Sequence, residues 1–304
     1  IVDTLWHVSR VAFAQSPDDP YSRARELMRD LGSPQVDLGI LAARQSDAVH
    51  LLGGGYLTST WRENLAVVAA AAELARSGAP MRAFATGLGL TPLSEDDASQ
   101  LSTLLAGFDH VDVRDAASAA AVDVPQAHDD AFFALGAGAI RIDRRESPAA
   151  MLLFQGDVHS IEPMRDAAVA SIAALRASGV EGTVGLVEAN PGVDALVLEA
   201  VKQASGGDVR FYPFAEVWTE GLPVRAGQTW FTSRFHIHLV AAMHGARGVA
   251  VNAGSDYYGV KHQSLLDEGT GWALVDADDV AESTPSLDES FAARARQLGR
   301  ERVA

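Results

Sequence analysis

The residues best able to do chemistry lie in one stretch, Thr229 to Lys261. Within it, a short apolar run ends at Thr232 and Ser233, two residue types whose side-chain oxygens cap helix N-termini. The pattern predicts a helix that begins here, directly after a strand, with Arg234 and His236 in its first turn. Parallel α/β sheets bind ligands at such junctions, and the free N–H groups of a helix start favour an anion.

Arginine offers a planar fork of N–H donors that fits a carboxylate or a phosphate, and histidine exchanges a proton near neutral pH. Arg234 and His236, with Lys261 further on, therefore predict an anion site with an acid–base group beside it. The alternative is structural, with Arg234 paired to a surface acid and His236 in a satisfied polar niche. His238 is interpreted as an ordinary histidine at the edge of the core, and His262 as structural or exposed.

Composition limits the functional classes. The chain has 304 residues, enough for two domains, and 48% of them are hydrophobic, which indicates a globular protein. Its net charge of -16 disfavours nucleic-acid binding and docking on anionic membranes through a basic patch. Without cysteine there is no disulfide, thiolate metal site or thiol nucleophile. No apolar stretch is long enough to span a membrane and no signal peptide is evident, so a cytoplasmic location is expected.

Apolar segments alternate with helical patterns along two halves of the chain. Expected strands are 1–8, 48–52, 81–86 and 110–113, then 150–154, 183–187, 209–212, 228–231, 249–251 and 272–275. This alternation predicts α/β architecture with parallel sheets covered on both faces. The charged, proline-containing segment 141–148 is the expected linker. The prediction is thus two Rossmann-like domains, 1–145 and 146–304, whose sheets face across a cleft that is the default ligand site.

Three further patterns could mark a metal, phosphate or sugar site. His128, Asp129 and Asp130 are adjacent and cannot easily converge on one ion, so they indicate a loop or helix cap, and no metal site is expected. The triplet Gly53–Gly55 either brings backbone N–H groups close to a phosphate or sugar or forms a tight turn. Tyr56 and Trp61 could stack on a sugar ring. Neither a dinucleotide-binding fingerprint nor a P-loop is present.

The chain resembles the polysaccharide pyruvyl transferase family in four stretches. These are the glycine triplet after a strand at 51–55, a G-x-G-h-x-P turn at 86–92, a V-R-[DE] strand end at 111–115 with a D-x-A-F at 129–132, and an R-x-H motif at 233–236 followed by Lys261. The resemblance spans about residues 48–266. It departs from the family at Phe235, where leucine is more usual, and in lacking the family's Gly- and Asn-containing loop near the N-terminus.

The resemblance implies a GT-B-like fold and a transferase of cell-envelope polysaccharide biosynthesis. The implied reaction moves the pyruvyl group of phosphoenolpyruvate onto two hydroxyls of one hexose, which forms a pyruvate ketal and releases phosphate. Arg114, Arg234 and His236 fall on positions that bind the donor or do chemistry in relatives. The acceptor is expected to be an oligosaccharide or a lipid-linked sugar, which is compatible with peripheral association at the inner face of the membrane and with a homo-oligomer. Expected substrate contacts are Gly53, Gly54, Gly55, Tyr56, Trp61 and Lys261.

The chemistry of this reaction can be stated from the residue types. Phosphoenolpyruvate carries a phosphate and a carboxylate, which Arg114 and Arg234 could clamp from the two domains. Protonation of its methylene carbon creates a cationic centre that a sugar hydroxyl attacks. Phosphate then leaves and a second hydroxyl closes the ketal. His236 is the expected acid, and either it or a carboxylate of Asp115 or Asp129–Asp130 is the expected base. No cofactor is needed.

Two other functions are compatible with the sequence. A GT-B glycosyltransferase would use a nucleotide sugar, and Glu268, beyond Lys261, could hold its ribose; binding of a uridine or guanosine diphosphate sugar would favour this function. A non-catalytic module would bind a sugar or anion without turnover.

Overall fold

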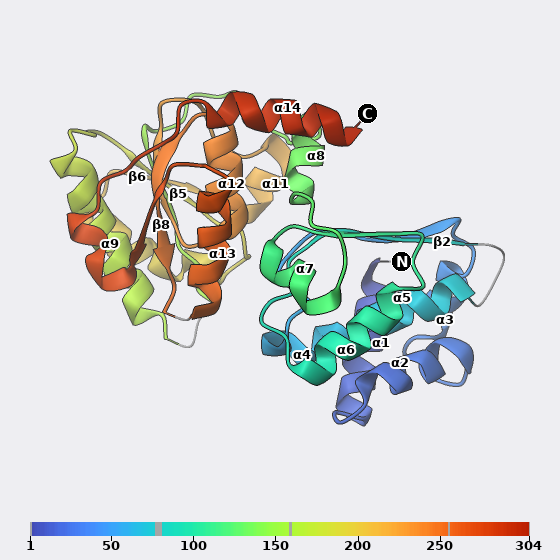
Figure 1. Cartoon of the computed structure of the whole chain (residues 1–304). Coiled ribbons are helices and arrows are strands. Elements are labelled where there is room, and N and C mark those ends of the chain that lie inside the picture. Colours follow the sequence, from blue (N-terminus) through green and yellow to red (C-terminus); the bar gives the residue numbers. More distant parts are fainter. Residues whose placement is uncertain (1, 77–80, 158–159, 255, 304) are drawn as a thin grey trace. The chain divides into compact units, whose positions relative to one another are not determined.

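The computed structural model describes residues 2–76, 81–157, 160–254 and 256–303, and contacts divide the chain into two compact units. Unit 1 is Ile1–Asp130 and unit 2 is Ala131–Ala304. Each unit is a mixed α/β structure built on a parallel sheet (Figure 1), as the alternating pattern predicts. The two are described separately below.

Unit 1 is built on a three-stranded parallel sheet of order β1-β2-β3. Its elements are α1 (Val2–Gln15), α2 (Pro20–Arg29), α3 (Asp37–Ala43), β1 (Ala48–Leu51), η1 (Ser59–Trp61), α4 (Arg62–Leu65), α5 (Val67–Arg76), β2 (Arg82–Leu88), α6 (Glu95–Leu105), β3 (His110–Val113) and α7 (Ala116–Val122). Ser94 caps α6, because its hydroxyl accepts a hydrogen bond from the Asp97 N–H at 3.1 Å.

The strand expected at the start of the chain is wrong. Residues 2–15 form α1 instead, and the apolar side chains of Leu5, Val8 and Ala12 are buried against the rest of unit 1. Their spacing of three and four residues matches one face of a helix, whereas a strand would bury every second residue. The β-branched residues at 1–8 indicated a strand, but packing on α2, α4 and α5 outweighs that local preference.

Unit 2 is built on a six-stranded parallel sheet of order β6-β5-β4-β7-β8-β9. Its elements are α8 (Asp130–Gly136), β4 (Ala150–Leu153), α9 (Glu162–Ala177), β5 (Val184–Val187), η2 (Asp194–Val197), α10 (Leu198–Ala204), β6 (Val209–Tyr212), α11 (Phe214–Glu220), β7 (Thr229–Thr232), α12 (Phe235–Met243), β8 (Arg247–Asn252), α13 (Asp256–Asp267), β9 (Ala273–Asp276), η3 (Ala277–Glu282) and α14 (Phe291–Val303).

The chain fills this sheet from its centre outward. It runs from β4 to β5 and β6, returns to place β7 on the other side of β4, and continues outward to β8 and β9. This is the 3-2-1-4-5-6 order of doubly wound Rossmann-like sheets. The order reverses between β4 and β7, so the loops at their carboxyl ends diverge to opposite faces. Ligands of such sheets bind in the crevice at this reversal, the topological switch point.

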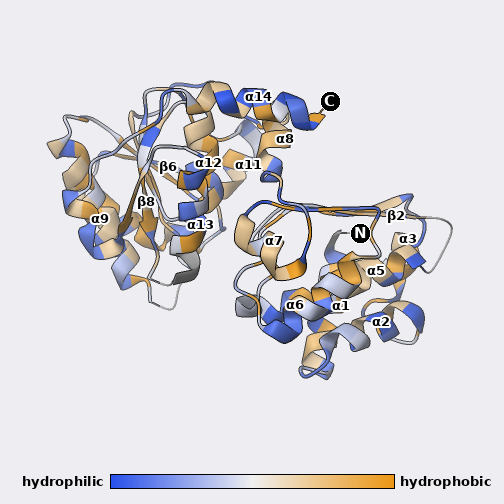
Figure 2. Ribbon diagram, viewed as in Figure 1, coloured by the Kyte–Doolittle hydropathy of each residue, from blue (hydrophilic) through white to orange (hydrophobic). Residues whose placement is uncertain are grey.

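Alternate residues of the central strands enter two different cores. On β4, Ala150 and Leu152 pack in the core that includes α9, whereas Met151 and Leu153 pack in the core that includes α12 and α14. All four are fully buried, because helices cover both faces of the sheet. Figure 2 shows the outer helices α9 and α14 carrying both hydrophilic and hydrophobic residues, as amphipathic helices do.

The segment 141–148, expected to link two domains, instead packs within unit 2. Ile142 forms a parallel bridge with Leu222, and the Asp143 N–H donates to the Leu222 carbonyl at 3.0 Å. Preceding it, Phe132 of α8 is fully buried and contacts Phe291 of α14 edge to face. The contacts therefore divide the chain after Asp130, earlier than the expected boundary at 145.

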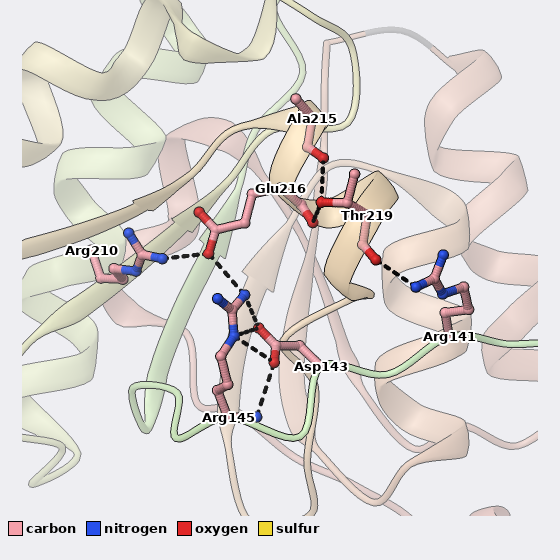
Figure 3. A network of polar contacts seen from close by, with 7 residues as sticks. All are labelled: Arg141, Asp143, Arg145, Arg210, Ala215, Glu216 and Thr219. Carbon is pink, nitrogen blue, oxygen red and sulfur yellow. Dashed lines mark hydrogen bonds and ion pairs between the residues drawn. The ribbon is translucent and has the colours of Figure 1, made fainter.

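The charges that made this segment resemble a linker find partners on unit 2 (Figure 3). Arg145 donates to both oxygens of Asp143 and also to Glu216 of α11, which accepts from Arg210 as well. Arg141 donates to the backbone carbonyl of Thr219. The hydrogen bonds from Arg145 lower the pKa of the Asp143 carboxyl below its usual value. Charged residues alone thus do not indicate a solvent-exposed linker.

Candidate functional site

The junction of β7 and α12 is close to what the sequence predicts. Helix α12 begins at Phe235, Arg234 occupies its N-cap position, and His236 lies exposed in the first turn. The expected capping by Thr232 and Ser233 is wrong. The Thr232 hydroxyl accepts from the Arg234 N–H at 3.1 Å, and the Ser233 hydroxyl is used elsewhere.

Ser233 joins the two loops at the switch point. Its hydroxyl accepts a hydrogen bond from the Gln155 N–H at 2.8 Å, and its own N–H donates to the Leu153 carbonyl at 3.2 Å. Gln155 follows β4 and Ser233 follows β7, so these bonds hold together the two strand ends between which the sheet order reverses. Arg234 is the next residue, which places the best sequence candidate at the position where Rossmann-like sheets bind ligands.

Two carboxylates hold the Arg234 guanidinium. Its Nη2 lies 2.5 Å from Asp194 Oδ1 and 2.8 Å from Asp157 Oδ1, and its Nη1 donates to Asp157 Oδ2 at 3.1 Å. Burial opposes the charged guanidinium, but the hydrogen bond and charge of Asp194, followed by those of Asp157, raise the pKa of Arg234 above its ordinary value. Arg234 is therefore a permanent cation with 22% of its side chain exposed.

The two carboxylates differ in how firmly they are held. Asp194 is fully buried and accepts three backbone hydrogen bonds, from Gly156 at 3.0 Å, Ala189 at 3.1 Å and Asn190 at 2.8 Å. Asp157 is 35% exposed and pairs with the Arg234 guanidinium. Asp194 is therefore a fixed part of the site, whereas Asp157 forms an exposed ion pair, which contributes about 0–1 kcal/mol.

Two buried donors in these loops lack acceptors. Among the residues that the structure describes, neither Gln155 Nε2 nor Arg234 Nε has a hydrogen-bond partner, although both atoms are shielded from solvent. A buried donor without an acceptor costs about 1–3 kcal/mol, so most such atoms in proteins are satisfied. These two donors lie in the loops after β4 and β7, which hydrogen bonds hold together. They indicate a place for a ligand rich in oxygen acceptors.

The remaining candidates in unit 2 lie on or beside α13. Lys261 is half-buried in the middle of this helix, which packs on α12 and β8. Glu268, the residue considered for a nucleotide ribose, is half-buried just after α13 ends. Within the described ranges, no group of three side chains is arranged to hold a metal ion.

Arg114, the second expected anion clamp, lies inside unit 1. Its side chain is only 3% exposed, and its Nη1 donates to Asp129 Oδ2 at 2.8 Å. Asp115, one of the carboxylates considered as a base, caps α7 by accepting from the Ser118 N–H at 2.8 Å. Asp130 accepts from the Gly53 N–H at 2.7 Å. These groups make structural contacts within unit 1.

The glycine triplet follows β1, and Gly54 forms a parallel bridge with Leu88 at the end of β2. The Gly54 carbonyl accepts from the Gly89 N–H at 3.0 Å, and a Cβ added to Gly53 would lie 2.6 Å from the Gly87 carbonyl oxygen. Glycine is thus required where the ends of β1 and β2 meet. The Gly53 N–H is already used by Asp130, and Gly55 is half-buried. Close backbone approach alone explains Gly53.

The two aromatic candidates occupy different surroundings. Tyr56 donates its hydroxyl to the Leu52 carbonyl at 2.7 Å and contacts Trp6 edge to face at 5.0 Å. Burial raises the pKa of this phenol above its usual value. Together with Trp6 and His50, Tyr56 lines a largely apolar cavity of about 400 Å³ beside β1. Trp61 lies half-buried in η1 and does not line this cavity.

Gln155, Asp157 and Asp194 are the site residues that sequence reasoning missed. Gln155 and Asp157 directly follow the strand β4, so their position at a strand end was visible. Only the strand order, however, shows that β4 lies beside β7. Asp194 follows β5 by several residues and carries no motif that would have distinguished it.

The chain has no match among protein-family models, and none among curated proteins. None of the described helices has the length and apolar character needed to cross a membrane. The residues at the reversal of the sheet order are called the switch-point site: Gln155, Asp157, Asp194, Arg234 and His236.

Proposed function

We propose that the protein is a pyruvyl transferase that uses phosphoenolpyruvate, with the switch-point site as its donor site. The observation that carries the proposal is the permanently charged Arg234 at the reversal of the sheet order, because its buried Nε and the nearby Gln155 Nε2 have no acceptor among the described residues. Phosphoenolpyruvate supplies phosphate and carboxylate oxygens, the acceptors that an arginine fork binds best.

Donor binding requires Asp157 to leave Arg234. With both carboxylates in place, two negative charges face the single positive charge of Arg234, which disfavours an anion at the guanidinium. Because Asp157 is partly exposed, its release costs about 0–1 kcal/mol. Asp194 stays, since three backbone N–H groups hold it, and it keeps the guanidinium oriented toward the incoming anion.

In the proposed reaction His236 supplies the proton. It lies exposed in the first turn of α12, two residues after Arg234, so it can reach a ligand bound to that guanidinium. Protonation of the methylene carbon makes the adjacent carbon electrophilic, and the oxygen of a sugar hydroxyl forms a bond to it while its proton passes to the now neutral His236 imidazole. The carbon–oxygen bond to phosphate then breaks, and a second hydroxyl closes the ketal and loses its proton.

The acceptor side and the assembly are further parts of the proposal. Unit 1 would bind the sugar, with Tyr56, Trp6 and His50 around the apolar cavity as candidate contacts. A GT-B-like pairing of the two units would bring acceptor and donor together. The reaction would take place in the cytoplasm, where cells make phosphoenolpyruvate.

A thermal-shift titration with phosphoenolpyruvate tests the donor site. Ligand at about 100 times its dissociation constant adds roughly 2.7 kcal/mol, which raises the melting temperature by several degrees. Arg234→Lys keeps the charge beside Asp194 but loses the planar fork, so it should abolish most of the shift. Arg247→Lys, at the opposite end of the same sheet, is the matched control and should keep the wild-type shift. Equal shifts in both variants would contradict the assignment.

A nucleotide-sugar glycosyltransferase is the second candidate, because the 3-2-1-4-5-6 sheet order is shared with nucleotide-binding proteins. Glu188, directly after β5, is the acid best placed to reach a ribose. Its two oxygens each accept one backbone hydrogen bond, from the N–H groups of Gly192 at 2.6 Å and Phe214 at 2.8 Å, and each keeps a lone pair for a ribose hydroxyl. Stabilisation by a nucleotide sugar but not by phosphoenolpyruvate would favour this second function.

A further inference from the structure

A buried chain of hydrogen bonds connects two histidines to the backbone of the switch-point site. His238 of α12 and His262 of α13 approach with their Nδ1 atoms 3.1 Å apart. His238 Nε2 lies 2.9 Å from the Thr270 hydroxyl, and His262 Nε2 lies 3.2 Å from the Ser233 carbonyl oxygen. Both histidines are at most 1% exposed, and His238 stacks on Trp272 with 4.5 Å between ring centroids.

The Ser233 carbonyl determines the direction of this chain. A carbonyl oxygen only accepts, so His262 must carry its proton on Nε2. His262 Nδ1 is then an acceptor, which requires His238 to donate from Nδ1. His238 Nε2 is left to accept from the Thr270 hydroxyl. Burial, and next the proximity of His262, lower the pKa of His238 well below 6.5, so His238 is neutral.

The peptide unit between Ser233 and Arg234 is thereby held at both ends. Its carbonyl accepts from His262 Nε2, and its N–H donates to the Thr232 hydroxyl at 3.1 Å. The Ser233 hydroxyl accepts from Gln155 just after β4, and the Ser233 N–H donates to Leu153 at the end of that strand. Arg234 therefore projects from a backbone that has little freedom to rotate, and His262 supplies the contact that comes from α13.

We propose that His238 and His262 are a positioning pair, which fixes the Ser233–Arg234 peptide through a directed chain of hydrogen bonds and so strengthens anion binding by Arg234. The role in anion binding rests on the proposed donor site, whereas the role in fixing the peptide does not. Neither histidine touches the substrate. Their effect is on affinity, through the placement of the guanidinium.

The tautomers test the first half of the proposal without any ligand. Long-range proton–nitrogen NMR correlations at pH 7 should show His262 protonated on Nε2 only and His238 on Nδ1 only. The Nδ1-protonated form expected for His238 is the rarer tautomer of a neutral imidazole, so its observation would be specific evidence for this chain of hydrogen bonds. Observation of His238 protonated on Nε2, or of either imidazole fully charged at pH 7, would overturn the assigned direction.

Amide exchange and binding test the second half. His262→Leu removes the donor to Ser233, whereas His262→Gln places an amide N–H near the position of Nε2. Exchange of the Arg234 amide should accelerate at least tenfold in His262→Leu and less in His262→Gln. The dissociation constant for phosphoenolpyruvate should rise at least tenfold in the leucine variant, with partial recovery in the glutamine variant. His244→Gln, at the other end of α12, is the control and should match wild type in both measurements.

The outcomes separate this proposal from the proposed function. If wild type binds phosphoenolpyruvate and His262→Leu, folded by circular dichroism, binds it equally well, the positioning pair is refuted and the function stands. If wild type does not bind phosphoenolpyruvate, the function fails. The histidine pair is then judged by the tautomers and by the Arg234 amide exchange, and unchanged exchange in the leucine variant would refute it.

Discussion

Asp194→Asn tests the central electrostatic feature of the site. Each carboxylate oxygen of Asp194 accepts two hydrogen bonds: Oδ1 from Gly156 and Arg234, and Oδ2 from Ala189 and Asn190. Asparagine has only one oxygen. Whichever way its amide is turned, an NH₂ group faces two donors, and Arg234 loses its buried counter-charge.

The structure sets the expected magnitude. Breaking a buried charge pair by removing one partner costs about 3–5 kcal/mol. Each backbone donor left without an acceptor costs about 1–3 kcal/mol, and this cost overlaps with the first and is not added in full. We therefore expect a loss of about 3–5 kcal/mol in the free energy of unfolding. For a domain of 150–250 residues this lowers the melting temperature by roughly 6–20 °C.

Asp157→Asn is the matched control, because it removes a charge from the same arginine at an exposed position. It should change the free energy of unfolding by at most about 1 kcal/mol. Urea unfolding followed by tryptophan fluorescence suits the comparison, since Trp230 and Trp272 are buried in unit 2. Equal stabilities of the two variants would refute the reasoning that Asp194 is the fixed carboxylate.

Three further predictions concern ligand affinity, pH and packing. Asp157→Asn should lower the dissociation constant for phosphoenolpyruvate severalfold by isothermal titration calorimetry, because the anion no longer competes with a carboxylate; weaker binding would contradict this. His238 stays neutral in the folded protein but takes up a proton in the unfolded chain, so stability is lost as pH falls below the unfolded pKa of about 6.5. In urea titrations, wild type should therefore lose about 1 kcal/mol more of its free energy of unfolding than His238→Gln between pH 7.5 and 5.5. Gly53→Ala should cost roughly 1–3 kcal/mol in the same assay, because its Cβ would meet a backbone oxygen, whereas Gly259→Ala, in α13 with its nearest atom at 3.4 Å, should be neutral or stabilising.

Local patterns predicted much of the element sequence and one residue of the site. The alternation of apolar segments indicated each observed strand after residue 47, because buried parallel strands produce short apolar runs. The change from apolar to polar residues after β7 indicated the start of α12, which placed Arg234 and His236 correctly at that helix start. Gly245, with φ of +80°, follows the end of α12, since glycine adopts this conformation without strain.

The sequence does not indicate which distant residues these side chains contact. Arg114 resembled an anion clamp, and its buried guanidinium pairs with Asp129, which follows α7 and lies 15 positions further on. His238 and His262 appeared unrelated, yet they meet across 24 positions because α12 and α13 pack on the same face of the sheet.

The sequence by itself determined which segments after residue 47 become strands and that an arginine stands at the start of α12. Those features depend on side-chain periodicity and on residues a few positions apart. Only the tertiary structure decided that β4 lies beside β7, that Asp194 holds Arg234, and that a histidine pair fixes its backbone. Strand order and contacts between distant residues arise from how the elements pack together, and no local pattern in a single chain encodes them.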